Sequence, residues 1–73
     1  MRNQPHYYRG YAVLPSAHRL PDGYFSSNLL LERPRIDAGG TLYRFDSLDY
    51  FNSADKAVRY AARWARDWID SRG

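Results

Sequence analysis

The sequence predicts an α+β domain, in which a three-stranded antiparallel meander is followed by one C-terminal amphipathic helix packed on one sheet face. Three observations predict this β-β-β-α order. Stretches rich in aromatic and β-branched residues occupy much of the chain before residue 51. The turn sequence "PDG" separates two of these stretches. The C-terminal stretch repeats small and apolar side chains at helical spacing.

The first expected strand covers residues 7–14, "YYRGYAVL". Pro15 interrupts it, because proline has no amide hydrogen to donate to a neighbouring strand. This strand is therefore expected either to lie at a sheet edge or to bend at Pro15, with a possible continuation at residues 17–20.

A β-hairpin is expected around residues 21–23, because proline, aspartate and glycine each favour a turn. Its second strand covers residues 24–34, in which alternate side chains point to opposite faces. Leu29 and Leu31 share one face and are expected to lie in the core.

Residues 34–40, "PRIDAGG", are expected to form a connection between strands. The third strand follows at residues 41–51. Its apolar positions change from odd to even numbers near Asp46 and Ser47, which predicts a bulge or break there.

The C-terminal helix can be capped by Asn52 or Ser53, with Asp55 in its first turn near the amide dipoles. It is expected to end near Asp70 or Ser71. Its packing side is predicted to consist of Ala54, Ala57, Val58, Ala61, Trp64, Ala65, Trp68 and Ile69.

Size and composition favour one small folded domain, residues 1–73. Aromatic residues make up 16% of the chain, more than is typical of disordered proteins. The chain has no cysteine, which excludes disulfides and favours a cytoplasmic location. No segment approaches the ~20 apolar residues needed to span a bilayer, so no membrane association is expected.

No residue pattern indicates catalysis, and the sequence predicts that the protein is not an enzyme. His6 and His18 lack the spacing and company of metal ligands, so no metal site is expected. Asp46 and Asp49 lie in a region expected to be exposed, and the serines have no adjacent base. The "AGG" at 38–40 lacks the lysine and helix of a phosphate loop, and no cofactor is predicted.

Tyrosines and arginines on the expected strands form a candidate interaction face, because one helix covers only one side of a sheet. These residues are Tyr8, Arg9, Tyr11, Tyr24, Arg33, Tyr43 and Arg44. The leading hypothesis is an interaction module that binds a protein partner or self-associates through the open sheet face or edge. The alternative is a nucleic-acid-binding module that uses the strand arginines and tyrosines. Tyrosines that merely fit a half-exposed sheet remain an equal explanation.

The exposed side of the helix carries a second basic group: Lys56, Arg59, Arg63 and Arg66. A solvated face is the preferred interpretation, because aspartates four residues away can neutralise these cations. The expected pairs are Asp55 with Arg59, Arg63 with Asp67, and Arg66 with Asp70. Trp64 and Trp68 are interpreted as core residues in preference to an anchor for a partner.

Two resemblances bear on this interpretation. The residues that carry the first are Tyr8, Gly10, Tyr11, Phe51, Ser53, Ala57, Tyr60, Ala61, Trp64, Ala65, Trp68, Ile69 and Asp70. In this pattern the chain resembles small bacterial sheet-plus-helix proteins, which are domains of unknown function, so the resemblance implies a fold and no activity. A looser likeness, through Phe51, Ser53, Ala57 and Ala61, is to the three-stranded DNA-binding arm of phage-type integrases. That likeness implies a sheet that enters the DNA major groove.

Overall fold

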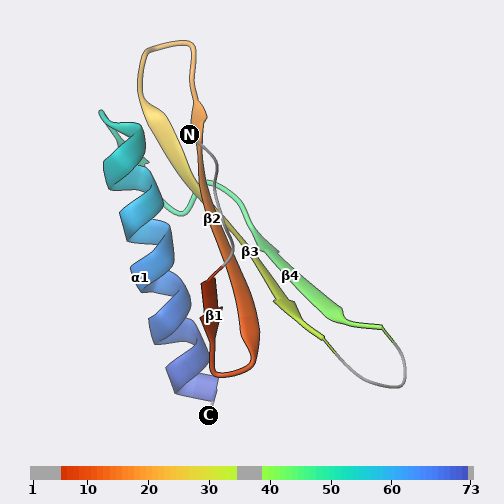
Figure 1. The fold of residues 1–73 in the computed structure, drawn as a ribbon. Coiled ribbons are helices and arrows are strands. Elements are labelled where there is room, and N and C mark those ends of the chain that lie inside the picture. Colours follow the sequence, from red (N-terminus) through yellow and green to blue (C-terminus); the bar gives the residue numbers. More distant parts are fainter. Residues whose placement is uncertain (1–5, 35–38, 73) are drawn as a thin grey trace.

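A computed structural model describes residues 6–34 and 39–72 of the chain. These residues form an antiparallel sheet followed by one helix, which lies along one face of the sheet (Figure 1). The strands run in the order β1-β2-β3-β4, and β5 pairs with β3. The elements are β1 (His6–Tyr8), β2 (Tyr11–Arg19), β3 (Phe25–Arg33), β4 (Thr41–Phe45), β5 (Tyr50–Phe51) and α1 (Ala54–Arg72). The predicted α+β class and C-terminal helix are confirmed.

The first expected strand is in fact a hairpin, so the prediction of one strand over residues 7–14 is wrong. Arg9 and Gly10 form a two-residue turn between β1 and β2, with φ angles of 50° and 84°. Positive φ at both positions is typical of the turns that match the twist of antiparallel strands. Gly10 adopts this conformation without the cost that a Cβ imposes.

Pro15 does not interrupt β2, contrary to the expectation from sequence. It is buried and pairs with Leu29 of β3. Tyr11 follows the two-residue turn, and its backbone groups point toward β1. The backbone groups of alternate residues on a strand point to the same side, so those of Pro15, four residues later, have the same direction. The described part of β1 pairs with β2 only as far as Val13. The nitrogen of Pro15 therefore points away from β3, and no bond to β3 is lost.

The hairpin predicted at residues 21–23 is confirmed. The amide of Gly23 donates to the carbonyl of Leu20 at 3.0 Å, and Leu20 donates to the carbonyl of Tyr24 at 2.7 Å. Gly23 has a φ of 91°, which explains why glycine occupies this position.

The break predicted near Asp46 and Ser47 is also confirmed, because it separates β4 from β5. Ser47 has a φ of 55°, and its amide donates to the side-chain oxygen of Asn28 at 2.8 Å. The connection expected at residues 34–40 falls largely on 35–38, which lie outside the described residues.

The core lies between α1 and the sheet. Its buried cluster consists of Tyr11, Val13, Leu29, Leu31, Ala61, Ala65 and Ile69. Leu29 and Leu31 are therefore core residues, as predicted. Ala57 is fully buried, and its carbonyl accepts a 2.6 Å hydrogen bond from the hydroxyl of Ser27. Small side chains at these positions allow the helix to approach the sheet closely.

Candidate interaction surfaces

The strand register assigns each sheet residue to one of two faces. Leu31 on β3 lies between Val13 on β2 and Tyr43 on β4, and all three pack with α1. The next residue back, Leu30, lies between Leu14 and Arg44. Because neighbouring side chains on a strand point in opposite directions, this second row faces away from the helix. We call that side the open face.

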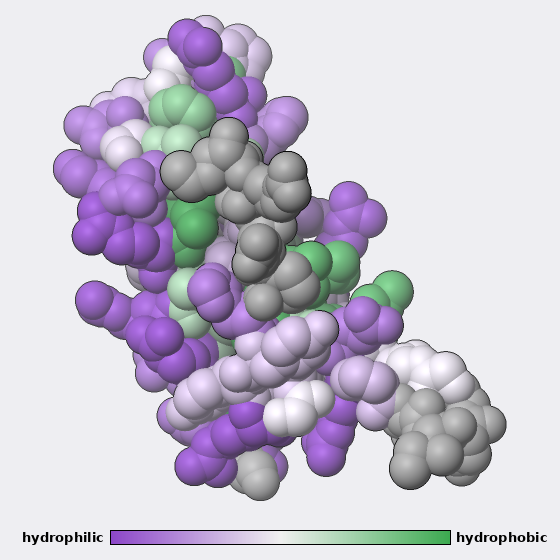
Figure 2. Space-filling view, viewed as in Figure 1, coloured by the Kyte–Doolittle hydropathy of each residue, from purple (hydrophilic) through white to green (hydrophobic). Residues whose placement is uncertain are grey.

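The open face carries exposed apolar side chains. Tyr7 is 75% exposed and Leu42 is 62% exposed, while Leu14 and Leu30 are half-buried. Hydrophobic atoms reach the surface along the β3 and β4 side of the molecule, next to hydrophilic ones (Figure 2). On the same face, a hollow of about 260 Å³ is lined by Ser16, Asn28, Leu29, Leu30, Arg44 and Asp46. The open face therefore combines apolar surface with a depression of side-chain size.

Opposite charges flank Leu30 on the open face. Glu32 lies two residues after Leu30 on β3, and Arg44 lies directly opposite Leu30 on β4. Both side chains are exposed. The Nε of Arg44 is 3.6 Å from the carboxylate of Asp46, and both of these side chains are more than 60% exposed. Such an exposed pair contributes little to stability and leaves Arg44 accessible to another carboxylate.

The seven residues of the predicted interaction face do not share one surface. Tyr11 is 5% exposed and belongs to the core, and Tyr43 packs on Trp68 with ring centroids 5.0 Å apart. Tyr24 lies at the end of the hairpin between β2 and β3, where it is 49% exposed. Of the seven, Arg44 is the one in the open-face row beside Leu30. The prediction did not apply strand alternation, which places Tyr43 and Arg44 on opposite faces of β4. It also missed the turn between β1 and β2, which sets the positions of Tyr8, Arg9 and Tyr11.

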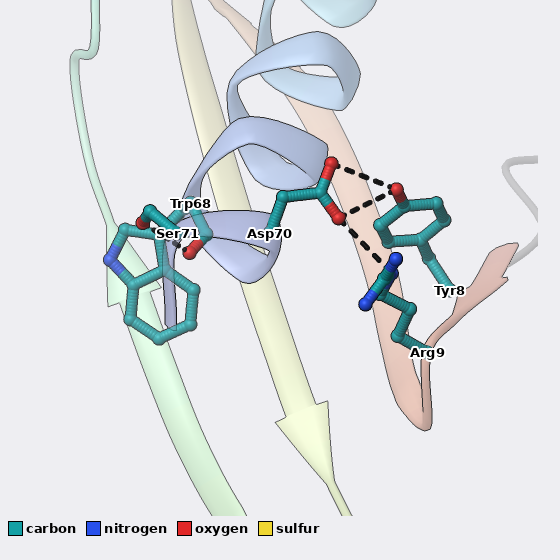
Figure 3. Close-up of polar contacts among 5 residues, drawn as sticks. All are labelled: Tyr8, Arg9, Trp68, Asp70 and Ser71. Atoms are coloured by element: carbon teal, nitrogen blue, oxygen red, sulfur yellow. Dashed lines mark hydrogen bonds and ion pairs between the residues drawn. The ribbon is translucent and has the colours of Figure 1, made fainter. Parts of the chain in front are cut away.

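Tyr8 and Arg9 join the first hairpin to the last turn of the helix (Figure 3). The hydroxyl of Tyr8 lies 2.8 and 3.0 Å from the two carboxylate oxygens of Asp70, to which it donates. The Nε of Arg9 is 3.1 Å from the same carboxylate. Asp70 stands near the helix C-terminus, where the amide dipoles disfavour a negative charge. Arg9 supplies the compensating cation, so these contacts primarily fasten the hairpin to the helix.

Four of the seven predicted residues line one cavity on the helix side of the sheet. This cavity, about 310 Å³ in volume, is lined by Arg9, Tyr11, Arg33, Tyr43, Ile69 and Arg72. We call it the arginine pocket. A terminal nitrogen of Arg33 donates to the hydroxyl of Tyr11 at 3.3 Å, and the guanidinium carbon of Arg72 lies 4.1 Å from the ring centroid of Trp68.

The outer side of α1 differs in part from the prediction. Arg59 and Asp55 form the expected ion pair. Arg66 does not pair with Asp70, because Asp70 turns toward Arg9 and Tyr8. Within the described ranges, no ion pair joins Arg63 to Asp67. The basic stripe is therefore less neutralised than expected.

The two tryptophans pack against the core cluster, as the preferred interpretation predicts, but neither is fully buried. Trp64 packs against Phe45 with ring centroids 4.8 Å apart and ring planes tilted by 57°. Trp68 packs against Tyr43 and Phe45. Both indole rings are half-buried. The fully buried positions of the helix are instead the alanines and Ile69.

Sequence reasoning missed three residues that shape these surfaces. Asp70 was assigned to Arg66, although an aspartate in the last helical turn is itself a signal that a cation lies nearby. Arg72 was not singled out, and its position in the arginine pocket depends on where the helix ends. Ser27 lies on the same face of β3 as Leu29 and Leu31, but its bond to Ala57 depends on where the helix lies.

The described part of the chain holds no group of three or more histidine, aspartate or glutamate side chains placed to bind a metal ion. Among the same residues, no helix is long and apolar enough to cross a membrane. Comparisons of the chain with protein-family models, curated proteins and solved structures gave no match. The resemblances inferred from the sequence therefore stay predictions.

Proposed function

We propose that the protein is a non-enzymatic interaction module that pairs with a second copy of itself through the open face. The observation that carries this proposal is a sheet face that no described element covers, on which Leu30 lies between Glu32 and Arg44. Tyr7 and Leu42 remain exposed in the single chain. Covering them on association removes apolar surface from water, which stabilises a complex by roughly 25 cal/mol per Å².

The charges favour a second copy as the occupant. In a twofold-symmetric pair, the same patch lies on both sides of the interface, so it must be complementary to itself. Glu32 and Arg44 lie on two sides of Leu30, and a twofold axis near Leu30 brings Glu32 of one copy toward Arg44 of the other. Complementary charges of this kind fix the orientation of the two partners.

The small size of the domain also supports association. A chain of 73 residues can enclose only one small core, and the buried cluster among the described residues contains seven side chains. Small domains without disulfides commonly gain stability by oligomerisation. Covering the open face gives this sheet a second packed layer, which is how sheet proteins bury both faces.

Nucleic-acid binding through the sheet receives less support. That alternative needs Arg9, Arg33 and Arg44 along one surface, because phosphate contacts must follow a backbone. Arg9 and Arg33 line the arginine pocket on the helix side, whereas Arg44 lies on the open face. This separation of the three cations favours the pairing proposal over binding to one DNA groove.

A charge-exchange experiment tests the proposal. Solution mass is measured for the wild type, for Glu32→Arg, for Arg44→Glu, and for the protein carrying both substitutions. We expect a dimer for the wild type, a weaker dimer for each single variant, and recovery in the double variant. Each single variant places like charges across the interface, whereas the double variant restores opposite ones.

Two outcomes would overturn the proposal. A wild-type mass that stays at 8.6 kDa up to high concentration excludes pairing. A dimer whose strength is the same in all four proteins places the interface elsewhere, for example at the edge of β4. As a control, Tyr24→Lys changes an exposed aromatic at the hairpin end and should leave the dimer intact.

A further inference from the structure

The arginine pocket brings three guanidinium groups together from distant parts of the chain. Arg9 comes from the turn between β1 and β2, Arg33 from the end of β3, and Arg72 from the last turn of α1. Tyr11, Tyr43 and Ile69 supply the remaining walls. The volume of about 310 Å³ lies at the lower end of the range for small-molecule pockets, roughly 300 to 1,000 Å³.

The positive charge of this pocket is only partly neutralised. Arg9 shares the carboxylate of Asp70 with Tyr8. Within residues 6–34 and 39–72, no carboxylate forms an ion pair with Arg33 or Arg72. Among the described residues, three arginines and one aspartate leave two positive charges around the cavity.

The guanidinium groups of Arg33 and Arg72 are held against aromatic rings. The guanidinium carbon of Arg33 lies 5.2 Å from the ring centroid of Tyr11, and that of Arg72 lies 4.1 Å from that of Trp68. Stacking of this kind restricts the side chain and leaves the edge donors of the guanidinium available. The rings therefore partly organise the donors before a ligand arrives.

We propose that the arginine pocket binds a phosphate monoester of a small organic molecule. A phosphate monoester carries about −1.5 to −2 charges at neutral pH, which matches the two positive charges that no described carboxylate pairs with. Guanidinium groups donate paired hydrogen bonds to phosphate oxygens. The tyrosine and isoleucine walls give the organic group an apolar surface. The C-terminal dipole of α1 opposes an anion, and Arg72 in the last turn offsets it.

An amide-resonance titration tests this site with three probes: phenyl phosphate, inorganic phosphate and benzoate. We expect saturable shifts at residues of the pocket with phenyl phosphate, and weaker binding of the other two. Inorganic phosphate lacks the ring, and benzoate carries a single charge. Equal binding of all three probes would overturn the assignment of a phosphate monoester.

Variants separate the pocket from general attraction of anions. Arg33→Gln and Arg72→Gln should each weaken phenyl phosphate binding by about tenfold or more, because each removes a charged donor. Arg63→Gln removes the same charge from the exposed side of α1 and should bind as the wild type does. Equal losses in all three variants, or no loss in the first two, would contradict the proposal.

Discussion

Leu30 and Leu31 are neighbours on β3, and they differ mainly in the face to which they point. Leu31 lies under the helix and is fully buried, whereas Leu30 is half-buried on the open face. The covered face has tilted aromatic contacts, a buried hydrogen bond from the hydroxyl of Ser27, and close helix packing. The open face has similar apolar side chains, and no described element forms a second layer on it. The described core therefore lies on one face of the sheet, and the proposed function uses the other.

The largest expected effect comes from truncating the covered leucine. Leu31→Ala removes a fully buried side chain and should destabilise the fold by about 2 to 5 kcal/mol. Leu30→Ala on the open face should cost clearly less in the single chain. Urea unfolding at low protein concentration measures both. Equal losses would show that the two faces contribute equally to the fold.

A substitution in the turn between β1 and β2 should give the next largest effect on stability. Gly10→Ala places a Cβ at a φ of 84°, and we expect a loss of about 1 to 2 kcal/mol. No atom within 4 Å obstructs that Cβ, so the cost is conformational. Gly10→Asn should lose less, because asparagine tolerates this conformation better. Thermal unfolding of the two variants tests the order, and an alanine variant as stable as the wild type would contradict it.

Two adjacent tyrosines on β1 sharpen the comparison further. Tyr8→Phe removes the hydroxyl that donates to Asp70, and should cost roughly 0.5 to 1.5 kcal/mol. Tyr7→Phe is the matched control, because Tyr7 is 75% exposed on the other face. Its effect on the unfolding of the single chain should be close to zero. The difference between the two variants, measured by urea unfolding, reports the contact between hairpin and helix.

The smallest effect is expected on the outer side of the helix, which belongs to neither sheet face. Asp55→Asn breaks the ion pair between Asp55 and Arg59. The side chain of Asp55 is 70% exposed and that of Arg59 is 75% exposed. Such i,i+4 pairs contribute roughly 0.2 to 0.5 kcal/mol, and salt screens them. The loss should disappear in high salt. A loss that persists in high salt would point to a role for Asp55 beyond the ion pair, in the first helical turn.

Sequence patterns predicted the parts of the fold that depend on local chemistry. Gly23 marked the second hairpin, the phase change at Asp46 marked the break, and alternation on β3 assigned Leu29 and Leu31 to the core. The first hairpin was missed because Arg9 takes a positive φ, which arginine adopts rarely. Without that turn, the sequence does not show which residues of β1 share a face with which residues of β2.

The composition of the surfaces was harder to predict than the elements. Tyr11 and Tyr43 resemble exposed strand tyrosines in sequence, yet the helix covers both. Which tyrosines are covered depends on strand register and on the angle of the helix, and neither is encoded locally. The arginine pocket joins residues from the first hairpin, β3 and the helix end, so no single stretch of sequence reveals it.

Sedimentation equilibrium over a range of concentrations tests the central claim about the open face most directly. The wild type should approach twice the 8.6 kDa mass of the chain as concentration rises. Leu42→Lys should remain a folded single chain, because it replaces an exposed apolar side chain with a charged one opposite Glu32. A wild type that stays monomeric, or a Leu42→Lys variant that pairs as strongly as the wild type, would contradict the account.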